Sequence, residues 1–357
     1  MSTLLSTPGG FRPGRFLLIV IFCLLALAAT TRAEGGAGVP AAPPELVEAF
    51  SKLRTDPPPP ELNRNSHFVI SDERHHELFR ETVTGRGGVY VGVGTDQNYT
   101  MAAWSRPEVL VLMDFDMLIP DLHRIYRLAF LNAADADDFV AMWGASDPRL
   151  TDLIEAEWPE SEARAPITRA LKISRGLVHG KLRRLRAYMK AEGIAHFLTD
   201  PEQFSWIVGM FKANRVFMVR GDLTADQTVL DIAAAAKAAN LPVRVLYVSN
   251  AEAYFRPYPP SYLRNMAALP MDDRSVVIRT CGFKPDWSPD PLYEYNVQPG
   301  DNFQRWMNTM KAGSVRTLLR GRVKDKVKKI SIANAEPPTP KAPKASPSEK
   351  SAKGGAR

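Results

Sequence analysis

The sequence predicts an α/β domain with a doubly wound, mostly parallel sheet covered by helices on both faces. Between about residues 66 and 310, short runs rich in Val, Ile and Leu alternate with longer segments of helical periodicity. This alternation is the pattern of βαβ units, and glycine or aspartate directly after the first runs is typical of their strand ends. A segment of this length is ample for one large hydrophobic core.

The predicted strands are short, apolar and bounded by turn residues. They cover residues 88–93, 109–113, 216–219, 243–248 and 275–280. For the last of them, an antiparallel position at an edge of the sheet is one option.

Helical periodicity fills the stretches between these strands. Residues 119–130 and the alanine-rich residues 226–239 each predict one helix. A long helical region lies between an acidic stretch at residues 135–138 and about residue 192, where Gly193 ends it.

Residues 1–33 have the layout of a secretory signal peptide. Arg12 and Arg15 precede the fourteen-residue apolar run FLLIVIFCLLALAA. This run is shorter than the roughly 20 residues of a membrane-spanning helix, so we expect cleavage after Ala33 and a mature chain that begins at Glu34. The expected location is the periplasm. An uncleaved membrane anchor is the alternative, and it places the domain on the same side of the membrane.

The two cysteines bear on the same question. Cys23 follows Phe22, whereas a lipoprotein signal has a small residue before its cysteine, so lipid attachment is a weaker alternative. Removal of the signal leaves Cys281 alone, and no disulfide can then form within the chain. The domain must therefore be stabilised by its core.

The segments on either side of the domain differ from it in composition. Residues 34–65 are rich in Pro, Ala and Gly and are expected to form a spacer, with a short amphipathic helix at residues 45–53. Residues 311–357 are expected to form a basic, disordered tail.

The formal net charge of +7 belongs to the two ends of the chain. Residues from Arg316 onwards carry +9 and the first 33 residues carry +3, which leaves −5 for residues 34–315. The basic character thus indicates a tail that could touch an anionic envelope surface, and we expect no nucleic-acid partner.

The turn after the first strand is the first candidate ligand site. Ligands of doubly wound sheets bind outside the carboxyl ends of the strands, where glycines allow close approach of the backbone. Only two of the three glycines of a dinucleotide fingerprint are present, and a structural turn held by Asx-type bonds is the alternative. The candidate residues here are Gly92, Gly94, Thr95, Asp96, Gln97 and Asn98.

Asp114 and Asp116 follow the second strand, where an acidic residue accepts hydrogen bonds from ribose hydroxyls in nucleotide-binding sheets. The alternative for Asp116 is to cap the next helix. His123, on that helix, could point toward the same pocket, or it could be an ordinary core or surface histidine.

Two later strand ends carry further polar candidates. Asp222 follows the strand at 216–219, and Asn250 and Glu252 follow the strand at 243–248. Each could reach a ligand, and each could instead cap a helix.

The sequence assigns no catalytic residue. No metal is predicted, since neither the His75-His76 pair nor any other group has the spacing of metal ligands. A Gly-x-Ser-x-Gly elbow is absent, and Cys281 has no histidine near it in sequence. Hydrolase chemistry is therefore without support.

The chain resembles an uncharacterised, mainly bacterial protein family, a domain of unknown function with a GVYxGVGxDQNxT motif. The resemblance covers about residues 68–280. It rests on GGVYVGVGTDQNYT from residue 87, on Asp114 with His123 and Tyr126, on LYVSNAEAYF from residue 246 and on RNMAALPMDDRSVVIRT from residue 264.

The resemblance implies a Rossmann-like fold similar to class I methyltransferases, with S-adenosylmethionine as the cofactor suggested by analogy. Gly92 and Gly94 would face its amino-acid part and Asp114 or Asp116 its ribose, with Asp222 at the rim. The third glycine of the methyltransferase turn is missing here. S-adenosylmethionine is also made in the cytoplasm, so export argues against its use.

Two hypotheses follow for the function. In the first, a polar cleft formed by Asp96, Asn98, Asp114 and Asn250 binds or acts on a small nucleotide-like or envelope ligand, and its carboxylates have shifted pKa values. In the second, the chain is a non-catalytic envelope interaction protein on a degenerate methyltransferase-like fold, and the cleft is filled and dry.

Overall fold

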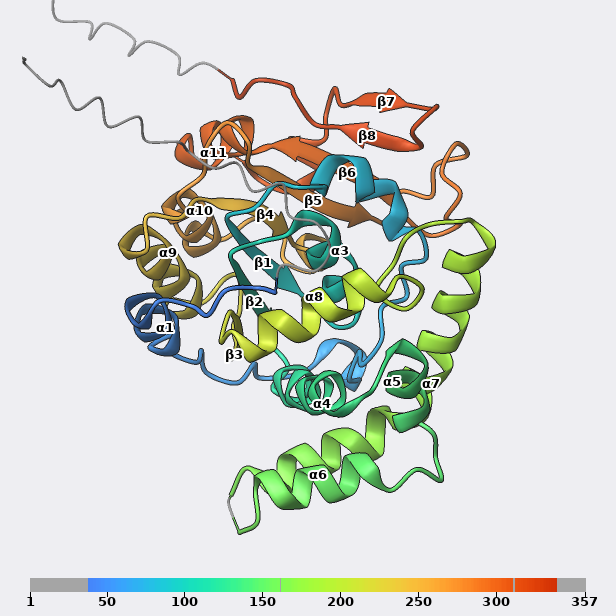
Figure 1. Ribbon diagram of the computed structural model, residues 1–357. Coiled ribbons are helices and arrows are strands. Elements are labelled where there is room, and N and C mark those ends of the chain that lie inside the picture. Colours follow the sequence, from blue (N-terminus) through green and yellow to red (C-terminus); the bar gives the residue numbers. More distant parts are fainter. Residues whose placement is uncertain (1–37, 161, 311, 339–357) are drawn as a thin grey trace, which may run out of the picture. The chain divides into compact units, whose positions relative to one another are not determined.

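A computed structural model describes residues 38–160, 162–310 and 312–338, all within one compact unit that begins at Gly38. The expected signal peptide lies outside the described residues. The unit is an α/β domain with a mostly parallel sheet between two layers of helices (Figure 1). The predicted fold class is confirmed.

The sheet has eight strands among the described residues, in the order β3-β2-β1-β4-β5-β6-β8-β7. The strands are β1 (Val89–Val93), β2 (Val109–Asp114), β3 (Val216–Arg220), β4 (Val243–Tyr247), β5 (Val276–Cys281), β6 (Glu294–Pro299), β7 (Val323–Asp325) and β8 (Ile330–Ile332).

Helices fill the connections between these strands. The α-helices are α1 (Pro44–Ser51), α2 (Arg80–Val83), α3 (Gln97–Ser105), α4 (Leu118–Asn132), α5 (Ala136–Met142), α6 (Arg149–Glu157), α7 (Arg164–Ala191), α8 (Pro201–Lys212), α9 (Thr228–Ala238), α10 (Pro260–Ala268), α11 (Gly300–Asn308) and α12 (Val315–Leu318). Short 3-10 turns are η1 (Asn63–Asn65), η2 (His76–Phe79) and η3 (Ala251–Ala253). The long predicted helical region before Gly193 thus contains α5, α6 and α7.

The five strands β3, β2, β1, β4 and β5 are parallel, and the strand order reverses between β1 and β4. β5 lies inside the sheet, since it pairs with β4 on one side and with the antiparallel strand β6 on the other. β8 continues the sheet parallel to β6, and β7 closes it as the antiparallel partner of β8.

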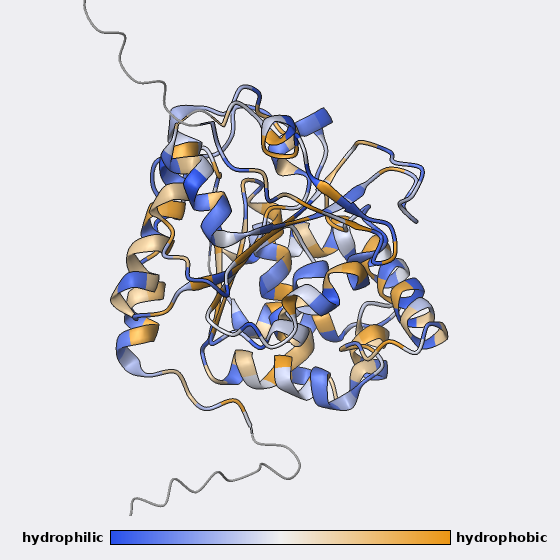
Figure 2. Cartoon of the chain, turned by 90° about the horizontal axis from the view of Figure 1, so that it is seen from above, coloured by the Kyte–Doolittle hydropathy of each residue, from blue (hydrophilic) through white to orange (hydrophobic). Residues whose placement is uncertain are grey.

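Each face of the sheet has its own hydrophobic core because successive side chains of a strand point to opposite faces. Tyr90 and Leu112 pack with α3, α4 and α8 on one face. Val91 and Met113 pack with α1, α9, α10 and α11 on the other. In Figure 2 the central strands are hydrophobic, and the helices on either side carry both hydrophobic and hydrophilic residues.

Residues 38–65, part of the segment for which we expect a spacer, pack against the sheet. Leu46 and Phe50 lie one helical turn apart on α1 and are buried, and the Phe50 ring stacks on Phe217 of β3 at 5.2 Å between centroids. Burial of such an apolar pair against strand and helix holds the segment in place.

The described residues 312–338, within the segment expected as a tail, add α12 and the β7–β8 hairpin to the unit. Val315, Leu318 and Ile330 are buried. The Arg322 guanidinium bonds both oxygens of Glu294 on β6, one of them at 2.7 Å. Apolar burial together with a two-point ion pair explains why a basic sequence is ordered here.

No helix in the described part of the chain is both long enough and apolar enough to cross a membrane.

Candidate functional site at the carboxyl edge of the sheet

The carboxyl ends of the parallel strands β3, β2, β1, β4 and β5 meet at one edge of the sheet, and the order reversal between β1 and β4 lies in its middle. Ligands of doubly wound sheets bind at this point. The expected site residues lie at or just after the strand ends on this edge, except His123, which is on α4.

Asn98 fills the turn after β1. Its Nδ2 donates to the carbonyl oxygens of Val93 at 3.2 Å and Thr95 at 3.3 Å, and its Oδ1 accepts from the Tyr90 hydroxyl at 3.0 Å. A Cβ added to Gly92 would lie 2.0 Å from Asn98 Oδ1. The glycine therefore makes room for the asparagine side chain of its own turn.

Gly94 and Gln97 close the other side of this turn. Gly94 has φ +93°, a conformation that favours glycine, and a Cβ there would lie 2.4 Å from Gln97 Nε2. Gln97 Oε1 accepts from the amide and the hydroxyl of Thr95, both at 3.1 Å. Asp96 accepts from the same hydroxyl at 3.2 Å through Oδ1, while its buried Oδ2 has no hydrogen-bond partner among the described residues.

The two carboxylates after β2 have different environments. Burial raises the pKa of Asp114 to about 7, although the backbone amide of Asp116 donates to it at 3.0 Å. Asp116 accepts from the amide of Leu118, the first residue of α4, at 3.1 Å. Its second oxygen lies 2.7 Å from His67 Nδ1. Asp116 thus accepts from the first amide of α4 and also holds the upstream segment.

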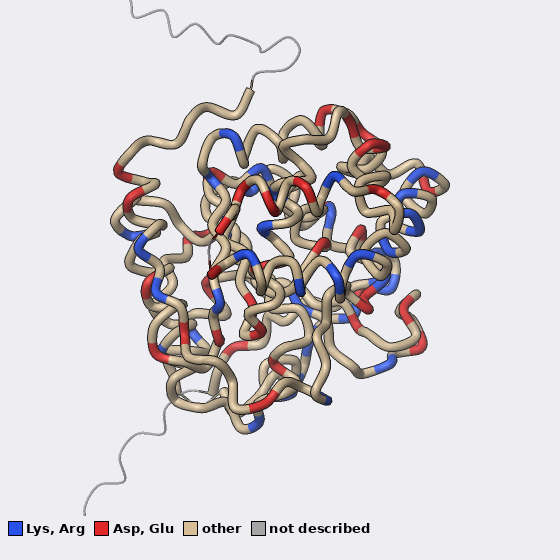
Figure 3. Tube along the Cα trace, turned by 90° about the horizontal axis from the view of Figure 1, so that it is seen from below, with Lys and Arg blue, Asp and Glu red and all other residues tan. Residues whose placement is uncertain are grey.

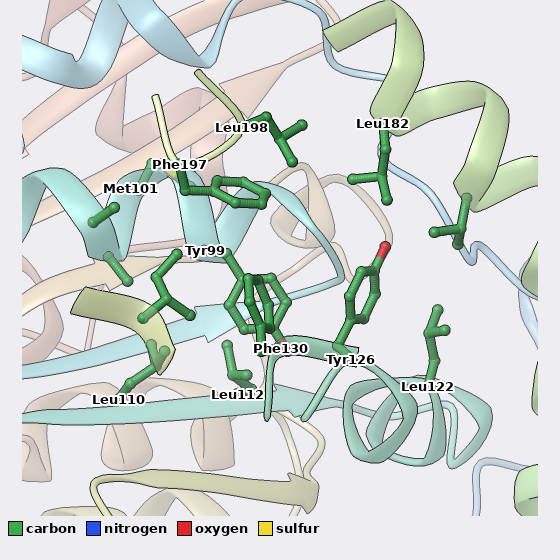
Figure 4. Packing of buried hydrophobic residues seen from close by; sticks show 14 of the residues in the cluster. Tyr99, Met101, Leu110, Leu112, Leu122, Tyr126, Phe130, Leu182, Phe197 and Leu198 are labelled. Atoms are coloured by element: carbon green, nitrogen blue, oxygen red, sulfur yellow. The ribbon is translucent and has the colours of Figure 1, made fainter. Parts of the chain in front are cut away.

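His123 is a fully buried core histidine. Its Nε2 lies 2.8 Å from the Gly94 carbonyl oxygen, which can only accept, so Nε2 carries the proton and Nδ1 accepts from the Tyr99 hydroxyl at 2.8 Å. Burial lowers its pKa to about 4. Figure 4 shows Tyr99 packed among Phe130, Tyr126 and other members of this core.

Asp222 shapes the turn after β3. Its Oδ1 accepts from the amide and the hydroxyl of Thr224, both at 2.7 Å, and its own amide donates to Asp56 Oδ2 at 3.0 Å. These bonds form an Asx-type turn. They engage the Asp222 carboxylate within its own loop.

Glu252, after β4, belongs to a buried ionic cluster. Its Oε1 accepts from the hydroxyls of Tyr258 and Tyr262, both at 2.6 Å, and its Oε2 lies 2.6 Å from Arg279 Nε. Asn250 in the same loop donates to the Tyr293 hydroxyl at 3.0 Å.

Glu73, which the sequence did not indicate, joins the ends of β4 and β5. Its Oε1 accepts from the hydroxyls of Ser249, at 2.8 Å, and Thr280. Its Oε2 accepts from the Tyr247 hydroxyl and lies 2.8 Å from His76 Nε2. Burial would raise the pKa of Glu73, but these bonds and the attraction to His76 outweigh burial and lower it to about 2.

The structure brings some of the expected residues together and keeps others apart. Residues 92–98 and His123 form one self-bonded cluster, and the Asp114 carboxylate adjoins this cluster through the backbone amide of Gly94, while Asp116 lies beside His67. Asp222 and Glu252 are engaged at the ends of other strands. The segment before β1 reaches two of these strand ends, through His67 and Glu73.

A small hollow of about 80 Å³ lies at the end of β5, beside the Glu73 network. Buried Glu252, Thr280 and Cys281 line its inner side, and exposed Arg256 and Arg316 line its rim. Neither arginine has a carboxylate partner among the described residues, and the Arg316 guanidinium lies over the Phe283 ring at 5.7 Å.

The sequence contains little local signal for Glu73, which sequence analysis did not identify. Glu73 lies more than 170 positions before Tyr247, Ser249 and Thr280 in the chain. Two features of the sequence give a weak signal. Ser249 and Thr280 bear hydroxyls at the ends of two apolar strands, and Glu73 with His75 and His76 precedes the first strand. In the described part of the chain, no three His, Cys, Asp or Glu side chains are grouped to hold a metal ion.

The sheet order and the position of these polar groups define a Rossmann-like α/β protein. The chain belongs to the family described as a domain of unknown function (DUF7790), whose model matches residues 68–334. That match begins just after His67 and extends through the β7–β8 hairpin. No curated protein matches the chain.

Proposed function

We propose that this chain is an exported, Rossmann-like ligand-binding protein, and that its small-molecule ligand carries an oxyanion, a phosphate or a carboxylate, that binds in the hollow at the end of β5. The observation that carries the proposal is the pair Arg256 and Arg316, exposed at the rim and without a carboxylate partner among the described residues. A guanidinium group can donate two parallel N–H···O hydrogen bonds to a phosphate or to a carboxylate.

The residues on the inner side of the hollow favour ligand binding over catalysis. Both oxygens of Glu252 are engaged by tyrosine and arginine, and the Thr280 hydroxyl donates to Glu73. Burial raises the pKa of the Cys281 thiol, which therefore stays neutral and is a poor nucleophile. The arginines are the donors left for a ligand.

The volume limits what can enter. At about 80 Å³ the hollow is small, so we expect it to take one compact oxyanion group while the rest of the ligand lies outside it. We prefer this place to the glycine turn because Asn98 takes the space over Gly92 where a nucleotide-like cofactor would pass.

Calorimetry on the chain from Glu34 tests the proposal, with inorganic phosphate, citrate, ATP, S-adenosylmethionine and S-adenosylhomocysteine as probes. We expect binding of at least one oxyanion probe, and a loss of affinity of about 10- to 100-fold in the double variant Arg256→Gln, Arg316→Gln. Arg320→Gln, an exposed arginine in the same region, is the matched control and should bind normally.

Two results would overturn the placement of the ligand. One is unchanged affinity in the double variant. The other is binding that requires Asp114 instead, which would return the ligand to the end of β2 and to the ribose-like interaction expected there.

A second candidate function is that of a non-catalytic envelope interaction protein. The observation in its favour is that Glu73 fills the ends of β4 and β5 with a network in which its oxygens are engaged by Tyr247, Ser249 and Thr280. On this hypothesis none of the probes binds. Cleavage of the signal is tested by sequencing the N-terminus of the protein from cells, which we expect to begin at Glu34, whereas an intact Met1 would contradict cleavage.

A further inference from the structure

Helix α7 (Arg164–Ala191) concentrates positive charge within an otherwise acidic region. Residues 34–315 have a net charge of −5, yet α7 contains nine Lys or Arg and no Asp or Glu, so the remainder of that region carries −14. The cations are Arg164, Arg169, Lys172, Arg175, Lys181, Arg183, Arg184, Arg186 and Lys190.

Four of these cations form a stripe along the outer face of the helix, which we call the α7 stripe: Arg169, Lys172, Arg183 and Lys190. Successive members are 3, 11 and 7 residues apart, close to whole turns of 3.6 residues, and all four are exposed. The stripe extends for about 30 Å at 1.5 Å per residue. The opposite face of α7 is buried.

The stripe is free of acidic partners. None of its four side chains has a carboxylate partner within the described residues, whereas neighbouring Arg186 pairs with Asp137 on α5. Figure 3 shows that Lys and Arg segments lie among Asp and Glu segments over the surface of the unit, and Figure 1 shows α7 along one side of it. A free line of cations within an otherwise acidic region of the chain indicates an anionic partner.

A groove between α5 and α7 accompanies one end of the stripe. It has a volume of about 270 Å³, and its walls are Val140, Arg183, Arg186, Ala187 and Lys190. Cationic heads above apolar walls suit a phosphate group attached to a less polar body.

We propose that the α7 stripe docks the protein on an anionic lipid surface, with lipid phosphates facing the cations and one headgroup in the α5–α7 groove. A bilayer presents its phosphates as a continuous plane, which a straight line of about 30 Å can engage along its whole length. The aromatic residue of α7, Tyr188, bonds to Glu77 at 2.7 Å and is not on the stripe, so the base-stacking platform typical of single-stranded nucleic-acid binders is lacking there. This surface is distinct from the hollow at β5.

Vesicle co-sedimentation of the chain from Glu34, which keeps every described residue, tests the inference. The vesicles contain equal parts of phosphatidylglycerol and phosphatidylcholine, with pure phosphatidylcholine as the neutral reference. We expect binding only to the anionic vesicles, weakening as salt rises. The triple variant Arg169→Gln, Lys172→Gln, Arg183→Gln should bind about 100-fold more weakly, at about fivefold per charge.

The matched control removes the same charge elsewhere: Lys212→Gln, Lys237→Gln, Lys284→Gln, three exposed lysines on other parts of the unit. It should bind within about threefold of the parent. Equal losses in the two triple variants would show that only net charge matters, and unchanged binding in the stripe variant would assign the effect to the basic tail. Either result overturns the inference, as would binding to duplex DNA in place of the anionic vesicles.

Discussion

Asn98 and Gly92 compete for one space: a Cβ on Gly92 would stand 2.0 Å from Asn98 Oδ1. The hydrogen bonds of Asn98 to Tyr90 and to the carbonyl oxygen of Val93 hold the amide in that position. In this fold a glycine at the end of the first strand usually admits a ligand. Here it admits a side chain of the following helix.

Gly92→Ala should therefore destabilise the protein rather than alter ligand binding alone. The new methyl group must displace Asn98 and break its buried bonds, at a cost of about 2–3 kcal/mol in the free energy of unfolding. Gly176→Ala is the control, because Gly176 is exposed on α7 with open space around it and alanine favours the helix by about 1 kcal/mol. Equal denaturation midpoints for the two variants would contradict this interpretation.

Glu73→Gln should remove a stabilisation that depends on pH. The folded-state pKa of about 2 lies below the ordinary glutamate value of 4.5, so the ionised carboxylate stabilises the fold above pH 4.5, and this contribution is lost as pH falls toward 2. A pKa difference of one between the folded and unfolded states corresponds to about 1.4 kcal/mol. We therefore expect Glu73→Gln to lower the free energy of unfolding by about 3 kcal/mol at neutral pH and by much less near pH 3.

Urea denaturation across this pH range measures the effect of Glu73→Gln. The exposed residue Glu61 offers the control Glu61→Gln, which should be neutral at every pH. A loss that is the same at pH 3 and pH 7 would mean that the glutamate matters through packing and not through its charge.

The fold was predictable because its signals are local. The strands at residues 89–93 and 109–113 are continuous apolar runs, and α4, which packs on them, has the 3.6-residue period. Such patterns are set by neighbours in the sequence, which is why the five predicted strands and the helices predicted at residues 119–130 and 226–239 agree with the structure to within a few residues. The long helical region before Gly193 proved to be three helices, and strands β6, β7 and β8 were not predicted.

The polar contacts at the strand ends were not predictable in the same way. Asp114 and Asp116 were identified from their position, but His67 and Glu73 act across 49 and more than 170 positions of the chain, respectively. Nothing in the residues next to Glu73 indicates that Thr280 will donate to it. Long-range pairing of this kind depends on how the whole chain packs.

Asp114→Asn should stabilise the protein at alkaline pH. Because burial raises the folded-state pKa from 3.8 to about 7, protonation favours the folded state, and the benefit present below pH 3.8 is lost as pH rises through 7. A neutral amide avoids the cost of a buried charge, so we expect a gain of about 1–3 kcal/mol at pH 8 and little change at pH 4.

Thermal unfolding at the two pH values tests this expectation, with Asp273→Asn, at an exposed aspartate, as the control. A stability gain at pH 4 equal to that at pH 8 would point to a cause other than ionisation. Loss of stability at pH 8 would mean that the charged form of Asp114 is the one that the fold favours.

Asp56→Ala should destabilise the protein, because Asp56, although it precedes the family match that begins at residue 68, belongs to the folded unit. Asp56 is buried, and its Oδ1 accepts from the amides of Gln227, at 3.1 Å, and Thr228, at 3.3 Å, at the start of α9, while its Oδ2 accepts from Asp222. A single helix-capping side chain contributes about 0.5–2 kcal/mol, and three amides lose their acceptor here, so we expect a loss of about 2 kcal/mol or more.

Hydrogen exchange locates the consequence of Asp56→Ala. The amides of Gln227 and Thr228 should exchange faster in the variant, while amides in β6 keep their protection relative to global unfolding. Thr55→Ala changes the exposed neighbouring residue and should leave both stability and exchange as they are. If Asp56→Ala behaved like Thr55→Ala, the segment before residue 66 would act only as a spacer, and α9 would have to be capped by solvent.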